Sequence, residues 1–136
     1  MRDEQPQRLE PLVLLVEDEL GLSKLMVMVL EDEGYRVVEA ANGVQGLTKL
    51  EQEKPALIIT DYMMPELNGY EMVCTIRKNR AYDDVPILMM SAALPQQLPV
   101  GDLVDHFLPK GTGLEKLVAT IRRLIEGGGT SSESTP

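Results

Sequence analysis

The sequence contains few of the residues that build stacking platforms, disulfide frameworks or histidine metal sites. It has no tryptophan, one phenylalanine and four tyrosines, so no aromatic platform for single-stranded nucleic acid is evident. The lone cysteine, Cys74, cannot form an internal disulfide. The lone histidine, His106, has no second histidine to pair with at a metal, and we expect a half-exposed strand residue there.

Positive charge is also scarce. Lys and Arg number 13 against 22 Asp and Glu, which gives a formal net charge of −9. Nucleic acid and anionic membranes both require a basic footprint, so we expect neither as a direct partner. No segment approaches the ~18 continuous apolar residues of a membrane span, and the polar start is unlike a signal peptide. We therefore expect a cytoplasmic protein without membrane insertion.

The length indicates one domain. A chain of 136 residues buries about two thirds of its unfolded surface when it folds. The Gly/Ser/Thr-rich segment 127–136 predicts a disordered tail, and residues 1–10 form a polar extension. Residues 11–126 remain as the folded domain.

Short apolar runs alternate with segments whose apolar residues recur at helical spacing. The runs predict strands and the spaced segments predict helices. Such alternation implies right-handed crossovers and a parallel sheet. The expected strands cover 11–16, 35–40, 56–60, 86–90 and 105–109, and the expected helices cover 19–32, 44–54, 70–77 and 114–125.

Acidic residues follow two of these strands. Asp61 comes directly after the apolar run 56–60, and ligands of open α/β sheets bind at the carboxyl ends of strands. Glu17 and Asp18 follow the run 11–16 in the same way. If these strands are neighbours, the three carboxylates share one pocket, where like charges raise each other's pKa. A hard cation such as Mg²⁺ would relieve that repulsion.

A plainer interpretation exists for each acid. Asp61 could simply begin a turn, where Asp is common. Asp18 could cap the following helix, and Glu19 could favour its first turn through the helix dipole. Capping does not explain Asp61, however.

Two further strands end in residues that can contact an anion. Ser91 follows the run 86–90, and Lys110 follows 105–109. In order and spacing the chain resembles the receiver domain of two-component response regulators, from about Leu12 to Ile125. The segment from Asp61 to Pro65 followed by Asn68 and Gly69 is the most specific part. The resemblance implies a flavodoxin-like, doubly wound, five-stranded parallel sheet of order 2-1-3-4-5.

The resemblance also implies a role for each matched residue. Asp61 corresponds to the phosphoacceptor and Asp18 to a direct Mg²⁺ ligand. Glu17 corresponds to an acid that acts on the metal through water, and Met63 would lend its backbone carbonyl. A histidine kinase, a histidine phosphotransfer protein or a small phosphodonor would supply the phosphoryl group.

Three more residues complete the set that the resemblance implies. Ser91 would hydrogen-bond the phosphoryl group, and Lys110 would pair with Asp61 and the phosphoryl oxygens. Phe107 would swing inward when the hydroxyl residue moves. The implied function is a phosphorylation-dependent switch or phosphorelay intermediate that changes binding of a downstream protein. We expect a stand-alone regulator without an output domain, whose only chemistry is self-phosphorylation and autodephosphorylation.

The chain departs from the family pattern at two places. Gly111 follows Lys110 where the family has proline, and Pro109 precedes it, which a strand tolerates only at a sheet edge. Between Leu94 and Val104, Pro99 would cost a helix ~3 kcal/mol. We therefore expect the fourth helix of the family to be short or missing.

Two other function classes stay open. A pseudo-receiver would keep the fold and the acids but signal without phosphate, and the altered 94–104 segment favours it. An Mg²⁺-dependent phosphohydrolase would use an aspartate nucleophile, but such enzymes usually carry a second carboxylate two residues later. Met63 occupies that position.

Overall fold

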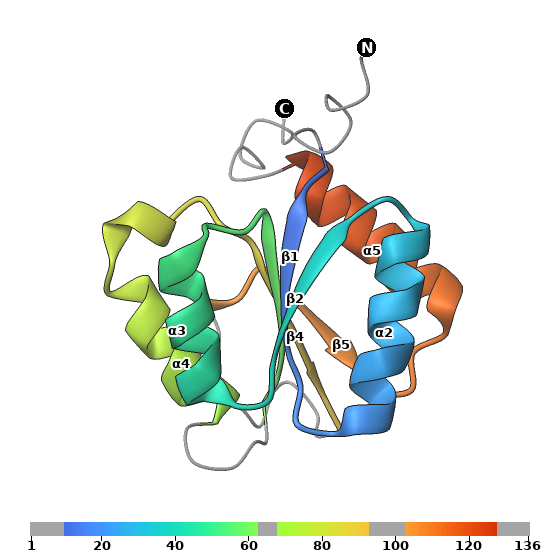
Figure 1. Ribbon diagram of the computed structural model, residues 1–136, viewed down its shortest axis with the longest axis horizontal. Helices are drawn as coiled ribbons and strands as arrows, with labels where there is room; N and C mark the ends of the chain where they lie inside the picture. Colours follow the sequence, from blue (N-terminus) through green and yellow to red (C-terminus); the bar gives the residue numbers. More distant parts are fainter. Residues whose placement is uncertain (1–9, 63–67, 93–102, 128–136) are drawn as a thin grey trace.

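The computed structural model describes residues 10–62, 68–92 and 103–127. Strands and helices alternate along the chain, as the sequence predicts (Figure 1). The strands are β1 (Leu12–Val16), β2 (Arg36–Ala40), β3 (Leu57–Asp61), β4 (Ile87–Ser91) and β5 (His106–Pro109). The helices are α2 (Leu20–Asp32), α3 (Gly43–Gln52), α4 (Gly69–Arg77), the 3₁₀ turn η1 (Arg80–Tyr82) and α5 (Leu114–Gly127).

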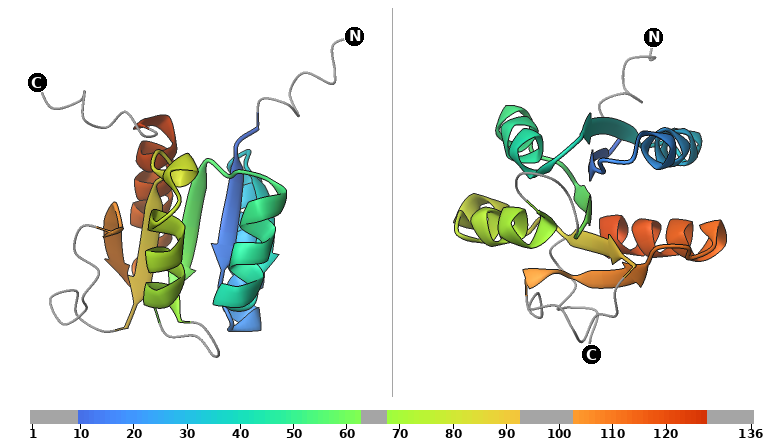
Figure 2. Two further views of the ribbon diagram at one scale, coloured as in Figure 1. Left: turned by 90° about the vertical axis from the view of Figure 1, so that its left-hand side faces the viewer. Right: turned by 90° about the horizontal axis from the view of Figure 1, so that it is seen from below.

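The five strands form one parallel sheet in the order β2-β1-β3-β4-β5. Helices α2 and α5 cover one face, and α3 and α4 cover the other (Figures 1 and 2). This is the doubly wound, flavodoxin-like arrangement, and the predicted strand order is confirmed. Because β1 and β3 are neighbours, the acids that follow them meet at one edge of the sheet.

The core lies in two layers, one on each face of the sheet. Leu14, Val16 and Ile58 point toward α3 and α4, whereas Val13 and Leu15 point toward α2 and α5. A strand covered on both faces must be apolar at every position, which explains the unbroken apolar runs in the sequence. In the part of the chain that the structure describes, no helix is long and apolar enough to cross a membrane.

The helix starts distinguish capping residues from site residues. Glu19, not Asp18, caps α2, and its carboxylate accepts the Leu22 N–H at 2.7 Å. Asn68 caps α4 in a capping box with Glu71. The interpretation of Asp18 as a helix cap is therefore wrong. Asp18 lies at the carboxyl edge of the sheet and does not cap α2.

Several boundaries differ from the prediction. Asp61 and Ser91 are the last residues of β3 and β4 rather than the first residues after them. Both residues are buried. Pro109 lies in β5, the edge strand, which confirms the condition set by proline's missing N–H. Helix α5 extends through Gly127, which the prediction assigned to the tail.

Three predictions fall wholly or mainly outside the described residues. They concern the polar extension at 1–10, the tail beyond residue 127 and the irregular fourth helix between Leu94 and Val104. Of the last segment, Leu103 and Val104 are described, and both pack against the core layer beside α3 and α4.

Candidate functional site

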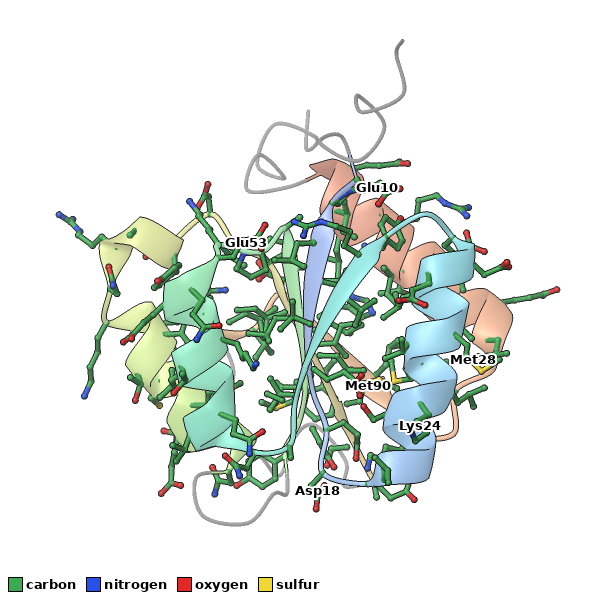
Figure 3. The ribbon with its side chains drawn as sticks, in the orientation of Figure 1. Glu10, Asp18, Lys24, Met28, Glu53 and Met90 are labelled. Carbon is green, nitrogen blue, oxygen red and sulfur yellow. The ribbon has the colours of Figure 1, made fainter. Side chains whose placement is uncertain are left out.

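The residues singled out in the sequence gather at the carboxyl ends of the strands. Glu17 and Asp18 follow β1, Asp61 ends β3, Ser91 ends β4 and Lys110 follows β5. Asp18 marks this edge at the bottom of the molecule in Figure 3. Four of the five strands thus contribute to one site, which no short segment of the chain could assemble alone.

The three carboxylates form one cluster. Glu17, Asp18 and Asp61 each offer a carboxylate oxygen, and these oxygens lie within 4.8 Å of one another. Glu17 and Asp61 are buried, with 6% and 5% of their surface exposed, whereas Asp18 faces solvent. Three carboxylates therefore lie close together, and two of them are buried. This arrangement destabilises the site when all three are ionised and no cation is bound.

The pKa of Glu17 is raised in this cluster. Burial raises the pKa of its carboxyl group, the Glu19 N–H partly opposes the rise, and the charge of Asp61 adds to it. The Glu19 N–H donates to Glu17 Oε2 at 3.0 Å. This backbone bond orients the Glu17 side chain toward the cluster rather than toward solvent.

Lys110 is the cation of the site. Its Nζ donates to Asp61 Oδ2 at 2.7 Å and lies 3.5 Å from Glu17 Oε2. Burial alone would lower the pKa of Lys110, but the hydrogen bond and charge of Asp61 outweigh it, so the pKa is raised. The ammonium group therefore stays charged and bridges the two buried carboxylates.

The loop after β5 shows how Lys110 reaches the site without the family's proline. The Lys110 N–H donates to the Ser91 carbonyl at 3.0 Å, which extends the β4–β5 pairing to Lys110 itself. Gly111 then takes a φ of +94°, a conformation closed to proline because its ring fixes φ near −65°. The substitution is thus accompanied by a different turn, and the contact between Lys110 and Asp61 is made.

Ser91 and Phe107 share one face of the sheet. Met89 pairs with Phe107, and both contribute to the core layer beside α3 and α4. Ser91 follows Met89 by two positions, so its side chain points to the same face. Ser91 is 1% exposed and Phe107 is half-buried. The hydroxyl and the aromatic ring therefore lie on one face of the sheet, on adjacent strands.

Two residues contact Asp61 through its main chain, and sequence reasoning did not predict either contact, although Gly69 belongs to the segment that carries the resemblance. Thr60 is buried, and its hydroxyl donates to the Asp61 carbonyl at 3.0 Å. Gly69, at the start of α4, packs directly against the same carbonyl. The available signals were a hydroxyl in an otherwise apolar strand and a glycine next to a helix cap.

The donor set fits a hard divalent cation. All three side chains supply carboxylate oxygens, and the exposed Asp18 leaves one side of the cluster open to water. Mg²⁺ prefers oxygen ligands and keeps several waters, so a few carboxylates beside solvent suit it. Met63, predicted to add its backbone carbonyl, lies outside the described residues.

Comparison with known proteins gives one consistent result. The family model of the response regulator receiver domain matches residues 13–122. The hybrid signal transduction histidine kinase D of Dictyostelium discoideum is 35% identical over 119 residues, which cover 85% of this chain and 8% of that protein. This chain covers between 35% and 56% of the length of seven similar transcriptional regulators.

Two similar solved structures contain magnesium. The receiver domain of a sensor histidine kinase from Pseudomonas aeruginosa PAO1, with magnesium coordinated in its active site cleft, has a TM-score of 0.80 and 28% identity. The alignment covers 86% of this chain and 98% of that one. The response regulator TrrA from Thermotoga maritima, in complex with Mg²⁺ and BeF, has a TM-score of 0.77 and 28% identity, covering 84% and 98%.

Proposed function

The chain belongs to the response regulator receiver domain family, and we propose that it is a phosphorylation-dependent switch or phosphorelay intermediate with Asp61 as the phosphoacceptor. One observation carries the proposal. Asp61 is buried, yet its carboxylate lies 2.7 Å from Lys110 Nζ and within 4.8 Å of oxygens of Glu17 and Asp18. A buried acid that faces a cation and two further acids is arranged to take up ligands rather than to balance charge.

The proposed chemistry is transfer of a phosphoryl group to a carboxylate. An Asp61 oxygen attacks the phosphorus, and the bond from phosphorus to the donor's nitrogen or oxygen breaks, with the electron pair leaving on the donor. Such transfers depend mostly on positioning and on neutralising charge. Lys110 supplies fixed positive charge beside the nucleophile, and the Ser91 hydroxyl lies on a neighbouring strand end as a neutral donor.

The three acids would hold Mg²⁺ next to the nucleophile. Asp18 and Asp61 would bind it directly, and Glu17 would act through water. When bound, the ion would screen the repulsion between the Asp61 carboxylate and an incoming phosphate. The similar structures that carry magnesium support this assignment.

Phosphorylation would be read out through Ser91 and Phe107. If the hydroxyl turns toward a phosphoryl oxygen, it vacates space that the half-buried ring can enter. Two ring positions form a bistable element that one ligand biases. A histidine kinase or histidine phosphotransfer protein would supply the phosphoryl group, and a downstream protein would respond to the changed surface. Beyond self-phosphorylation and autodephosphorylation, we propose no enzymatic activity.

Intact-mass spectrometry tests the proposal directly. Incubation with acetyl phosphate and Mg²⁺ should add one phosphoryl group to the wild type and none to Asp61→Asn. Asp84→Asn is the matched control, because Asp84 pairs with Lys54 away from the site and should not affect labelling. Undiminished labelling of Asp61→Asn would contradict the assignment. A wild type that takes no phosphoryl group would favour the pseudo-receiver.

A further inference from the structure

The main chain of Asp61, like its side chain, makes specific contacts. The buried Thr60 hydroxyl donates to the Asp61 carbonyl at 3.0 Å. The Tyr62 N–H donates to the Met90 carbonyl at 3.2 Å, which continues the β3–β4 pairing past Asp61. The peptide unit after the nucleophile is therefore fixed by a side chain on one side and a strand on the other.

Gly69 packs against the same peptide unit, between Asp61 and Tyr62. A Cβ added to Gly69 would lie 2.1 Å from the Asp61 carbonyl oxygen and 3.0 Å from both the Asp61 carbonyl carbon and Tyr62 Cα. All three are backbone atoms, which cannot rotate away as a side chain can. The φ of Gly69 is not in the left-handed region, unlike that of Gly34 or Gly111, so the need for glycine is spatial. Only a residue without a Cβ lets α4 begin this close to β3.

Both the start of α4 and strand β3 are fixed by hydrogen bonds, so neither can move easily to make room for a side chain at position 69. The start of α4 is fixed by the capping box, in which Asn68 accepts the Glu71 N–H at 2.8 Å and donates its own N–H to Glu71 at 3.1 Å. The Gly69 N–H donates to the Tyr62 carbonyl at 2.8 Å, and Met72 and Val73 anchor the first turns in the core. Strand β3 is paired on both edges. A side chain at position 69 would therefore displace the Asp61 main chain, α4, or both.

We propose that Gly69 and Thr60 are positioning residues for the phosphoacceptor. Together they determine where the Asp61 carbonyl lies, and hence how its carboxylate meets Lys110 and the acids after β1. Neither residue touches the transferred group. The inference rests on the proposed phosphorylation of Asp61, and it extends the site to residues that act through the main chain.

The size of the displacement that Gly69→Ala requires gives the expected change in the rate of phosphorylation. To reach 3.0 Å, the shortest contact a real Cβ tolerates, the Asp61 oxygen and the new methyl group must separate by about 1 Å. A misplacement of about 1 Å at a reacting group can slow a reaction on the order of 100-fold. Gly69→Ala should therefore slow phosphorylation by roughly 10- to 100-fold in a protein that still folds.

The matched controls are alanine substitutions at two other glycines. Gly113→Ala adds a methyl group with no atom within 4 Å. Gly46→Ala crowds the Met72 sulfur at 2.8 Å and Val16 Cγ2 at 3.1 Å, so it strains packing without touching Asp61. Both should phosphorylate at the wild-type rate, even if Gly46→Ala lowers the melting temperature.

The experiment measures the rate of phosphorylation by acetyl phosphate at saturating Mg²⁺, at a temperature where circular dichroism shows each variant folded. Varying the acetyl phosphate concentration separates the maximal rate from donor binding. We expect Gly69→Ala to reduce the maximal rate and to weaken Mg²⁺ binding measured by calorimetry. A folded Gly69→Ala with wild-type rate and Mg²⁺ affinity would overturn the proposal.

Substitutions at Thr60 provide a second test if Gly69→Ala does not fold. Thr60→Val removes the hydroxyl at nearly constant shape, and Thr60→Ser keeps it. We expect a several-fold slower maximal rate in the first and a restored rate in the second. Equal rates in all three proteins would overturn the role of Thr60. If the wild type itself accepts no phosphoryl group, the proposed function fails, and unchanged Mg²⁺ dissociation constants in Gly69→Ala and Thr60→Val would overturn the positioning role separately.

Discussion

Two cation-centred clusters lie at opposite ends of the sheet, and they differ in how their charges are balanced. Before β4 and β5, Arg77 donates to the carbonyls of Tyr82, Val85 and Leu103 at 2.9 to 3.1 Å, and to Asp105 at 3.1 Å. Asp105 also accepts the Ile87 N–H at 2.8 Å. One cation meets one acid, and the remaining donors meet backbone carbonyls.

At the carboxyl ends of the strands, by contrast, acids outnumber the cation. Lys110 contacts two buried carboxylates, and the exposed Asp18 adds a third acid to the same cluster. The Arg77 cluster is satisfied by the protein alone and joins α4 to the segments before two strands. The Lys110 cluster is left with excess negative charge, which a cation or a chemical change at Asp61 would relieve. The two clusters thus differ in charge balance: protein groups neutralise Arg77, whereas three carboxylates surround the single ammonium group of Lys110.

Removal of Arg77 should have the largest effect on stability. Arg77→Met removes the four hydrogen bonds of the guanidinium group and the ion pair with Asp105, although Asp105 keeps the Ile87 N–H. We expect the free energy of unfolding to fall by about 3 kcal/mol. Mg²⁺ should not restore it, because the cluster lies at the opposite end of the sheet. Urea denaturation with and without Mg²⁺ measures both effects. A loss below about 1 kcal/mol, or recovery on adding Mg²⁺, would remove the contrast between the clusters.

Removal of Lys110 should have a smaller effect that depends on Mg²⁺. Lys110→Met leaves Asp61 and Glu17 unneutralised, but the lysine is partly exposed, so we expect a loss of about 2 kcal/mol without Mg²⁺. A bound cation should offset part of this loss, since a ligand of the native state stabilises it by mass action. The same urea denaturation curves provide the measurement. If Mg²⁺ stabilised the wild type and left Lys110→Met unchanged, the excess-charge account would be wrong.

Neutralising Asp18 should act in the opposite direction. Asp18→Asn relieves repulsion within the cluster, so the melting temperature without Mg²⁺ should rise. The gain in free energy of unfolding should stay below about 1 kcal/mol, because Asp18 is exposed. The stabilisation by Mg²⁺ should shrink at the same time. Asp61→Asn is a less clean test, because it also removes the partner of Lys110.

Asp84→Asn is the control for Asp18→Asn in thermal unfolding. The Lys54 hydrogen bond lowers the pKa of Asp84, which shows that this acid is stabilised in its charged form. Its neutralisation should leave the melting temperature unchanged or slightly lower it. A rise in both variants would indicate a general effect of net charge rather than repulsion within the cluster.

His106 should have the smallest effect on stability. Its charged neighbours, Arg123 and Lys116, are both positive. Burial lowers the pKa of His106, and the charges of Arg123 and Lys116 lower it further. The unfolded chain therefore binds a proton at higher pH than the folded one. The stability that neutral His106 contributes is present above its ordinary pKa of 6.5 and is lost as the pH falls through the lower folded value.

The pH dependence can be checked with His106→Gln. The free energy of unfolding of the wild type should fall from pH 7 toward pH 5 more steeply than that of the variant, measured by urea denaturation. Arg123→Gln should reduce the wild-type slope in part, because Arg123 lies 3.5 Å from His106 Nδ1. Identical slopes in wild type and His106→Gln would show that His106 does not couple to folding.

The sequence predicted the fold because its signals were local and strong. Runs such as 12–16 and 87–90 are apolar throughout, which is the pattern of strands buried on both faces. The boundaries were displaced by one residue at Asp61 and Ser91, because a polar residue was taken to end a strand. Backbone pairing decides the boundary instead, and both residues are paired with neighbouring strands.

The rest of the site depended on tertiary contacts. Glu17, Asp18 and Asp61 could be grouped in advance, because parallel neighbours bring their carboxyl ends together. Gly69 was named as part of the motif, but its contact with the Asp61 carbonyl could not be derived, because that contact depends on how closely α4 approaches β3 in space. Arg77 was missed for a similar reason, since its acceptors come from segments far apart in sequence.

The most direct test of the account is to locate the phosphoryl group in the wild-type protein. After incubation with acetyl phosphate and Mg²⁺, borohydride reduces an aspartyl phosphate to homoserine, and peptide mass spectrometry then identifies the altered position. We predict homoserine at position 61 and none at position 18, no 5-hydroxynorvaline (the product from a glutamyl phosphate) at position 17, and a much reduced yield when Mg²⁺ is replaced by EDTA. Homoserine at another aspartate, or equal yield without the metal, would contradict the central claim that the charge imbalance around Asp61 makes it the phosphoacceptor.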